Sequence, residues 1–356
     1  MLDLATSTRY CTYCPKLCRH TCPVSHAEAR ETLTPQTKMA TLRVLNTGEL
    51  PLDTTSSASL YGCTGCGACT EACRHEITPG RHLFTGRALA ESGEAGHPAL
   101  VGLTHRLRTV AERAAQTVAA QIPEARRATR GPTALFPACQ APELAPTALT
   151  LFDRAQAHLP VAKVSRLCGG YPLLAGGLPD AFRLHAETLS HELAGFDRVA
   201  VACPACAWAM KVEYPAHGVP LRPTVIHTSQ LLAEVADRLT PTRKLPAAFY
   251  HDPCYLGRHL GLYEPPRQAL RLALDEVREF SRCRATSECS GGGGLLPITM
   301  PKTAAAIARA RLSEVHEAGL QRVVTGCATC QRQLHREGIV AYDLIEMVEQ
   351  ATRPVV

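Results

Sequence analysis

Two dense runs of cysteine near the start of the chain constrain its fold more than any other feature. The first, CTYCPKLCRHTCP, has the spacing C-x2-C-x3-C-x3-C-P, and the second, CTGCGACTEAC, has the spacing C-x2-C-x2-C-x3-C. The start of the chain has no secretion signal and no apolar run is long enough to span a membrane, so we expect a cytoplasmic protein. Disulfides are rare in that reducing compartment. The 17 cysteines of this 356-residue chain therefore predict metal or redox chemistry.

The spacing of the two runs is typical of ferredoxins with two [4Fe-4S] clusters, where the fourth cysteine of each run crosses to the other cluster. The predicted ligands of the first cluster are Cys11, Cys14, Cys18 and Cys73, and those of the second are Cys63, Cys66, Cys69 and Cys22. The first run has one extra residue, and Arg74 follows Cys73 in place of proline, so this pairing is less fixed than the number of clusters. Zinc modules usually present separated pairs of thiols, so the pattern favours iron–sulfur clusters over zinc.

The rest of the chain contains an internal repeat in which cysteines recur at matched intervals. ALFPAC and FYHDPC each end an apolar segment, LCGG and CSGGGG each set a cysteine before glycines, and ACPAC and GCATC each end in C-x2-C. The two sets are Cys139, Cys168, Cys203 and Cys206, and Cys254, Cys289, Cys327 and Cys330. Two copies of one unit are therefore expected.

Apolar, strand-like segments alternate with helical segments in both copies. The predicted strands are residues 133–137, 198–202, 247–251 and 322–325, and the predicted helices are 180–194, 231–239, 266–274, 303–318 and 343–350. This alternation predicts parallel α/β units with thiols at the carboxyl ends of the strands. The expected fold is a multidomain α+β protein. It has a helical two-cluster ferredoxin domain at residues 1–98, a linker helix at 99–130, and α/β repeats at 131–240 and 241–356.

From Cys11 to Cys330 the chain resembles proteins that join a two-cluster ferredoxin domain to a duplicated cysteine-rich CCG domain. These are heterodisulfide reductases (their D-type subunit) and the iron–sulfur subunits of glycolate oxidase, lactate utilisation and anaerobic glycerol-3-phosphate dehydrogenase. HDPCYLGRHLGLYEPPR and CSGGGGLLP are especially typical. In disulfide-reducing members five cysteines per copy hold a non-cubane [4Fe-4S] cluster. Here Leu167 and Ser290 each replace one cysteine of the CC pair, which puts that cluster in doubt.

Each copy nevertheless keeps four thiols, so the resemblance implies two [4Fe-4S] clusters in the ferredoxin domain and up to two more iron–sulfur clusters. The second copy is the stronger candidate for a third cluster, the first copy is the weaker candidate for a fourth, and free thiols are the alternative for either. Cys283 belongs to no set and is expected to be an ordinary thiol. His251, near Cys254, either tunes or moves a proton there or is simply hydrogen-bonded at a strand end.

The resemblance implies an electron-transfer iron–sulfur subunit. It would relay single electrons between a flavin-dependent dehydrogenase and a quinone, a flavoprotein or a thiol/disulfide acceptor, and any link to the inner membrane face would run through a partner. No dinucleotide fingerprint is present, so flavin chemistry would lie on the partner. The alternatives are an enzyme that reduces a disulfide at a cluster in the second copy and a non-redox metal-binding assembly subunit. The mild net charge of +6 is scattered along the chain and does not predict nucleic-acid binding.

Overall fold

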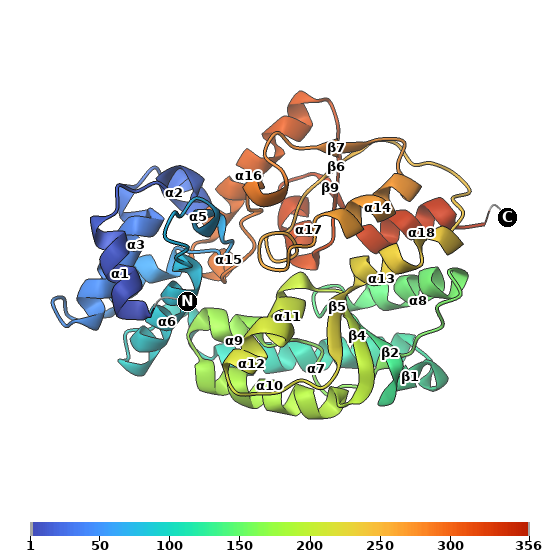
Figure 1. Ribbon diagram of the computed structural model, residues 1–356, viewed down its shortest axis with the longest axis horizontal. Coiled ribbons are helices and arrows are strands. Elements are labelled where there is room, and N and C mark those ends of the chain that lie inside the picture. The colour runs from blue at the N-terminus through green and yellow to red at the C-terminus, as the bar shows by residue number, and fades with distance from the viewer. Residues whose placement is uncertain (1–2, 355–356) are drawn as a thin grey trace.

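The computed structural model describes residues 3–354, which form a helical N-terminal part and two parts that each contain a parallel sheet. Figure 1 shows the helical part (blue) beside the two sheet-containing parts (green to yellow, and orange to red), which lie against each other. The mixed fold of helices and parallel strands expected from the sequence is thereby confirmed. None of the helices between residues 3 and 354 combines the length and the apolar composition of a membrane span.

The N-terminal part is built from short helices joined by tight turns. Its helices are α1 (Leu4–Tyr13), α2 (Pro23–Glu28), α3 (Pro35–Asn46), α4 (Thr54–Ser57), α5 (Ala68–Glu71) and α6 (Pro79–Ser92), with 3-10 turns η1 (Arg19–Thr21), η2 (Glu31–Leu33), η3 (Ala58–Tyr61) and η4 (Pro98–Leu100). Proline is the first residue of α2, α3 and α6, where its missing N–H costs no helical hydrogen bond. Proline therefore helps to define where these helices start.

The first sheet has five parallel strands in the order β1-β3-β2-β4-β5. Its strands are β1 (Arg127–Ala128), β2 (Arg130–Phe136), β3 (Val161–Ala162), β4 (Gly195–Val201) and β5 (Thr224–His227). The surrounding helices are α7 (Leu103–Gln121), α8 (Ala145–Arg154), α9 (Tyr171–Gly176), α10 (Pro179–Leu193), α11 (Pro204–Trp208), α12 (Tyr214–Ala216) and α13 (Thr228–Glu234), with a π-helical turn at Ala209–Glu213, and the 3-10 turns are η5 (Glu124–Arg126), η6 (Pro142–Leu144) and η8 (Ala236–Arg238).

The second sheet has four parallel strands in the order β7-β6-β8-β9. Its strands are β6 (Ala248–Tyr250), β7 (Val277–Glu279), β8 (Arg322–Thr325) and β9 (Val340–Asp343). The helices are α14 (Glu264–Ala273), α15 (Leu296–Thr299), α16 (Pro301–Glu317), α17 (Ala328–His335) and α18 (Leu344–Thr352), with the 3-10 turn η9 (Arg284–Thr286). This order equals β3-β2-β4-β5 of the first sheet, so the internal repeat seen in the cysteine spacing is also a repeat of topology.

The two sheet-containing parts, called the first and second repeat below, pack through helices. Helix α13 lies against α14 and α8 against α18. One apolar core runs through this contact, since it joins Leu135 and Val199 of the first sheet to Val324 and Leu270 of the second repeat. Burying a shared core fixes the orientation of the two carboxyl sheet edges.

The linker helix predicted for residues 99–130 is shorter in the structure. Helix α7 covers only Leu103–Gln121, because Gly102 starts it in a left-handed conformation (φ 73°) and Pro123 follows its end. Beyond the helix, residues 127–128 form β1 at the edge of the first sheet. The predicted strand 322–325 coincides with β8, and the other three predicted strands agree with β2, β4 and β6 to within a few residues.

Candidate metal centres

The first predicted ferredoxin set gathers around the end of α1. Cys11 lies on α1 and Cys14 follows its last residue, while Cys18 precedes η1. Burial raises the pKa of the Cys11 thiol to about 12, and the charges of Cys18, Cys73 and Cys14 add to the rise. Thiols that perturb one another in this way lie close together. The structure thus brings Cys73, from the second run, to the three cysteines of the first.

The contact between the two runs is also visible in the rings beside them. Tyr10 of α1 stacks on His75, which follows Cys73, with ring centroids 5.0 Å apart. The extra residue of the first run is accommodated where Lys16 adopts a left-handed conformation (φ 66°). The longer loop therefore still presents Cys18 to the same group of thiols.

The second predicted ferredoxin set lines one small cavity. Cys22, Cys63, Cys66 and Cys69 all face it, together with the stem of Lys38. Lys38 is 1% exposed, and its Nζ donates to the Gly62 carbonyl (2.7 Å) and to Cys22 Sγ (3.7 Å). The Gly65 N–H donates to Cys63 Sγ at 3.4 Å. An ammonium and an amide aimed at sulfur stabilise thiolates, as metal binding requires.

In the first repeat, four thiols lie at the carboxyl edge of the sheet. Cys139 follows β2, Cys168 precedes α9, and Cys203 and Cys206 open α11. Hydrogen bonds from Cys139 and Cys206 lower the pKa of Cys168, and the N–H groups of Gly170 and Gly169 donate to Cys168 (3.4 Å) and Cys206 (3.1 Å). The thiols form one chain of contacts in the order Cys139, Cys168, Cys206, Cys203.

The four thiols of the second repeat occupy matching places. Cys254 follows β6, Cys289 precedes α15, and Cys327 and Cys330 open α17. Hydrogen bonding to Cys254 is the main cause that raises the pKa of Cys289 to about 12. The pKa of Cys330 is raised chiefly by its bond with Cys327, and Ser290 also hydrogen-bonds Cys330. Ser290, which stands where a second cysteine was expected, therefore faces the same group.

Both repeats open onto a single cavity of about 390 Å³. Its wall includes Cys139, Cys168, Cys203, Cys206, Cys254, Cys289, Cys327 and Cys330. Sequence reasoning placed these thiols in two separate sets. The structure also brings Cys66 of the ferredoxin part into hydrogen-bond contact with Cys289, so the second ferredoxin site adjoins the cavity. The spacing of cysteines along the chain gives no signal for either contact.

Arg87 joins all three parts of the molecule and was not singled out from the sequence. Its side chain is fully buried and donates four hydrogen bonds to backbone carbonyls. The acceptors are Leu60 (3.0 Å) and Cys63 (2.8 Å) in the ferredoxin part, Ala175 (2.6 Å) in the first repeat and Gly294 (2.8 Å) in the second. A guanidinium suits this place because its five donors point in fixed directions.

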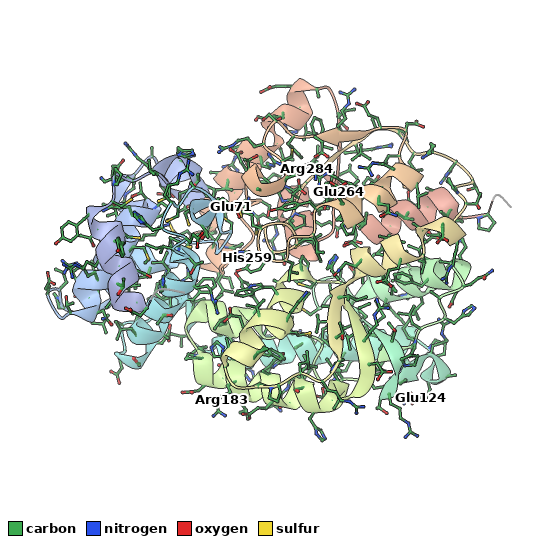
Figure 2. All side chains as sticks on the ribbon, in the orientation of Figure 1. Glu71, Glu124, Arg183, His259, Glu264 and Arg284 are labelled. Atoms are coloured by element: carbon green, nitrogen blue, oxygen red, sulfur yellow. The ribbon has the colours of Figure 1, made fainter. Side chains whose placement is uncertain are left out.

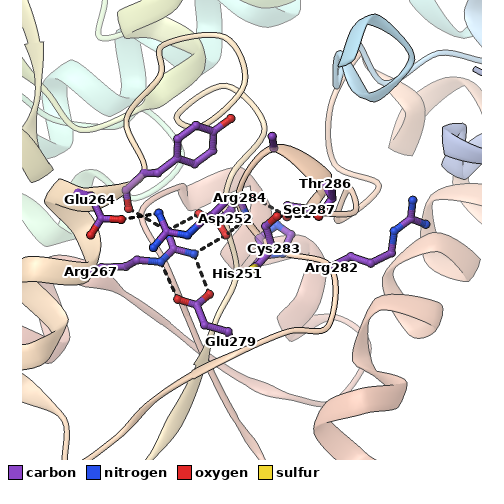
Figure 3. Close-up of polar contacts among 12 residues, drawn as sticks. His251, Asp252, Glu264, Arg267, Glu279, Arg282, Cys283, Arg284, Thr286 and Ser287 are labelled. Atoms are coloured by element: carbon purple, nitrogen blue, oxygen red, sulfur yellow. Dashed lines mark hydrogen bonds and ion pairs between the residues drawn. The ribbon is translucent and has the colours of Figure 1, made fainter. Parts of the chain in front are cut away.

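A second buried arginine supports the segment that carries Cys254. Arg267 on α14 is 2% exposed and binds both oxygens of Asp252 (2.7 Å each) and both oxygens of Glu279 (2.6 and 2.7 Å). Figure 3 shows these contacts between α14 and the segment that follows β6. Asp252 also accepts the Arg284 N–H at 2.8 Å. The network fixes the residue two positions before Cys254.

His251 is buried beside this network and Arg311, whose Nε lies 3.4 Å from its Nδ1. Burial, with the charge of Arg311 next, lowers the pKa of His251 well below its usual value. A neutral, hydrogen-bonded histidine at the end of a strand matches the simpler of the two roles considered for it. Cys283 is half-buried and lies outside all four thiol sets.

The donor chemistry of the four sets fits iron–sulfur clusters. Within residues 3–354, no three Cys, His, Asp or Glu side chains converge closely enough to hold one metal ion. In a [4Fe-4S] cluster each thiolate binds a different iron, so its ligands surround a volume and need not converge on a point. Four thiols per set and backbone N–H groups aimed at sulfur satisfy that requirement. The assignment of individual cysteines to clusters remains a prediction.

Comparison with known families identifies both cysteine-bearing regions. Residues 7–77 match the 4Fe-4S dicluster domain, and residues 248–335 match the cysteine-rich domain CCG. These are the two domain types that the resemblance implied, and the match to CCG covers the second of the two expected copies. The dicluster domain supports two [4Fe-4S] clusters in the N-terminal part.

Several characterised proteins are similar to this chain. It is 26% identical over 332 residues to a subunit of the dihydromethanophenazine:CoB--CoM heterodisulfide reductase of Methanosarcina barkeri, covering 82% of this chain and 78% of that protein. It is 25% identical to a subunit of the fumarate reductase (CoM/CoB) of Methanothermobacter marburgensis, covering 82% and 61%. Over 103 residues it is 36% identical to EtfAB:quinone oxidoreductase of Syntrophomonas wolfei, covering 28% and 14%. The chain is thus an iron–sulfur electron-transfer protein related to oxidoreductase subunits.

Proposed function

We propose that this iron–sulfur protein relays single electrons between a flavin-dependent dehydrogenase partner and an acceptor that is a quinone, a flavoprotein or a thiol/disulfide pair. One observation carries the proposal: thiol sites follow one another without a break from α1 to the cavity. The charge of Cys18 in the first set is among the causes that raise the pKa of Cys69 in the second set. The thiol of Cys66, also in the second set, contacts Cys289 of the second repeat. Adjacent one-electron sites are what a relay requires.

The balance of electrons explains why a relay would be needed. A reduced flavin releases two electrons, and a quinone takes up two electrons and two protons. When bound, a [4Fe-4S] cluster would supply a store for one electron at a time. The residues of this chain would make added negative charge tolerable, because buried Lys38 and Arg87 lie beside the thiols of the second set.

Anaerobic purification followed by iron analysis and EPR spectroscopy tests the relay. We expect a brown protein with at least about eight irons per chain, the content of two [4Fe-4S] clusters. Reduction should produce EPR signals from the ferredoxin sites and from a site in the second repeat. Fewer than about six irons would contradict the two-cluster relay. A colourless protein that contains zinc would instead favour a non-redox assembly subunit.

A second candidate function is reduction of a disulfide in the cavity. The favouring observation is that thiols of both repeats and Ser290 line one space of about 390 Å³, which is within the size range of small-molecule sites. A disulfide that accepts two electrons and two protons leaves as two thiols. Replacing Ser290 by cysteine restores the CC pair, so this candidate predicts that Ser290→Cys creates or raises disulfide turnover. Absence of turnover in both proteins would contradict this candidate.

A further inference from the structure

The ferredoxin part and the second repeat meet at a junction made of two thiols. Cys66 comes from the ferredoxin loop before α5, and Cys289 comes from the loop before α15. Their thiols hydrogen-bond each other, so two of the predicted ligand sets touch at this point.

One arginine spans this junction. Arg258 Nε donates to the Cys66 carbonyl (2.7 Å), and its Nη1 donates to the carbonyls of Ser287 (2.6 Å) and Ala285 (3.1 Å). The guanidinium therefore holds the loop that carries Cys66 and the loop that leads to Cys289 in one plane. Arg258 itself follows Cys254 on the third segment of the junction.

The last nitrogen of the Arg258 guanidinium is Nη2. This atom is buried and has no hydrogen-bond partner among the described residues. No carboxylate within residues 3–354 forms an ion pair with Arg258, and Asp252 is paired with Arg267 instead. The guanidinium is therefore a cation held by backbone carbonyls of the loop that carries Cys66 and of the loop that leads to Cys289.

The neighbouring residue strengthens the same contact. His259 Nε2 lies 2.9 Å from the Gly65 carbonyl, and its ring stacks on Tyr255 with centroids 4.4 Å apart. In Figure 2 His259 lies near the centre of the molecule, where the ferredoxin part meets the repeats. Gly67 faces the His259 ring, so the glycine-rich ferredoxin loop and the segment after Cys254 pack directly against each other.

We propose that Arg258 is the positioning residue of the junction: it clamps the Cys66 and Cys289 loops and places one shared positive charge between the second ferredoxin site and the second-repeat site. This inference rests on the proposed relay. A cation held near two sites, with its Nη2 atom buried, stabilises the reduced, more negative state of both, because Coulomb interactions strengthen as water is excluded. Arg258 should therefore raise both reduction potentials together.

Lys38 offers a matched control with a different reach. It is a fully buried cation, whereas Arg258 is half-buried; Lys38 lines the small cavity of the second ferredoxin set, and its Nζ donates to Cys22 Sγ of that set. Its hydrogen bonds also stay within the ferredoxin part. Removing Lys38 should affect one site, whereas removing Arg258 should affect two.

The experiment is an EPR-monitored redox titration of the whole anaerobic protein and its Arg258→Gln and Lys38→Gln variants. Signals of the second repeat are assigned with Cys327→Ser, which removes a thiol outside the ferredoxin part. We expect Arg258→Gln to shift both potentials to more negative values and Lys38→Gln to shift only that of the second ferredoxin site. Unchanged potentials in Arg258→Gln, or a shift of the ferredoxin site alone, would overturn the shared-charge role.

The variant Arg258→Lys separates charge from geometry, and it also serves if Arg258→Gln loses iron. Lysine keeps the charge but cannot donate to three carbonyls from one plane. We expect the Arg258→Lys variant to keep nearly the same reduction potentials. Electrons should enter the second repeat at least about tenfold more slowly, the size of loss typical when a residue that supports metal ligands is changed. Freeze-quench EPR measures this rate. An unchanged rate would overturn the clamp. If the unmodified protein gave no EPR signal from the second repeat, the proposed relay into the cavity would fail together with this inference. If the signal were normal but the variants had unchanged potentials and rates, only this inference would be overturned.

Discussion

The two repeats share a strand order and the placement of their thiols, yet the thiols connect differently. In the first repeat the described bonds between thiols run from Cys139 through Cys168 and Cys206 to Cys203, all within that repeat. In the second repeat the contacts extend outward, from Cys254 through Cys289 to Cys66 of the ferredoxin part. Duplication thus produced two similar sites, of which one lies on the route from the ferredoxin part and the other lies across the cavity.

The glycines after the first loop cysteine account for this difference. In the first repeat, a β-carbon at Gly169 would lie 2.9 Å from Cys206, so that loop closes on its own repeat. In the second repeat, β-carbons at Gly293 and Gly294 would overlap the carbonyl oxygens of Thr64 and Cys63. The glycine run turns the second loop towards the ferredoxin part because only a bare backbone fits there.

The largest expected effect comes from removing the connecting thiol. We predict that Cys289→Ser slows reduction of the second-repeat site by at least about 100-fold. The change removes a predicted ligand of that site together with the thiol that contacts Cys66, and even a residue that only supports a metal ligand can cost about 10–100-fold. The matching change in the first repeat, Cys168→Ser, should leave reduction of the second repeat nearly unchanged. Freeze-quench EPR after mixing with a one-electron reductant measures both rates. If both variants slowed reduction of the second repeat equally, the prediction that electrons enter through Cys289 would be contradicted.

The buried ion network provides the next largest contrast, since only the second repeat has one at this place. The first repeat has Pro137 where the second has Asp252. We predict that Arg267→Met lowers the free energy of unfolding by about 3–5 kcal/mol, because it leaves the buried Asp252 without its cation. The control Arg271→Gln removes an exposed pair with Glu264 and should cost under about 1 kcal/mol. Thermal unfolding of the iron-loaded protein measures both, and equal effects would contradict the prediction.

The fold was predictable where local sequence decides it. The cysteine spacings identified the ferredoxin part, and the apolar segments identified the central strands β2, β4, β6 and β8. The strands that were missed, such as β1 and β3, have two residues each and lie near the sheet edge, so they carry almost no pattern. Their existence depends on packing rather than on propensity.

The candidate site was predictable only within each set of thiols. The merging of two sets into one cavity, the Cys66–Cys289 contact and the roles of Arg87 and Arg258 all join residues far apart in the chain. Arg87 and Gly294, for example, are 207 positions apart. Such contacts are fixed by how the ferredoxin part and the two repeats pack together. The periodicity of a single sequence does not predict this packing.

Matched helix starts in the two repeats should give opposite responses to pH. His227 precedes α13 and Asp343 precedes α18, and each side chain caps its helix. Burial lowers the pKa of His227 to about 4 and raises that of Asp343 to about 7. The stability that neutral His227 contributes is present above its ordinary pKa near 6.5 and is lost as pH falls towards 4. The stability from protonated Asp343 is present below pH 3.8 and is lost as pH rises through 7.

Asparagine at either position keeps a capping group and removes the titration. We predict that Asp343→Asn removes a decline in stability of about 4 kcal/mol between about pH 4 and 7, and that His227→Asn removes a loss of about 3 kcal/mol below about pH 6.5, each taken over its full window. The difference in unfolding temperature between variant and parent, followed from pH 5.5 to 8, measures both. Parallel pH profiles for parent and variant would contradict the corresponding pKa shift.

The smallest predicted effect tests the glycine contact that distinguishes the two repeats. Gly294 and Gly338 both adopt left-handed backbone conformations, with φ of 59° and 88°. A β-carbon at Gly294 would overlap the Cys63 carbonyl, whereas nothing lies within 4 Å of one at Gly338. Both alanine variants bear the backbone strain of about 1 kcal/mol. Only Gly294→Ala should add about 1–3 kcal/mol for overpacking, and it should also slow reduction of the second repeat, because it pushes the two loops apart. If Gly294→Ala and Gly338→Ala were equally stable and equally fast, the glycine run would not be what joins the second repeat to the ferredoxin part.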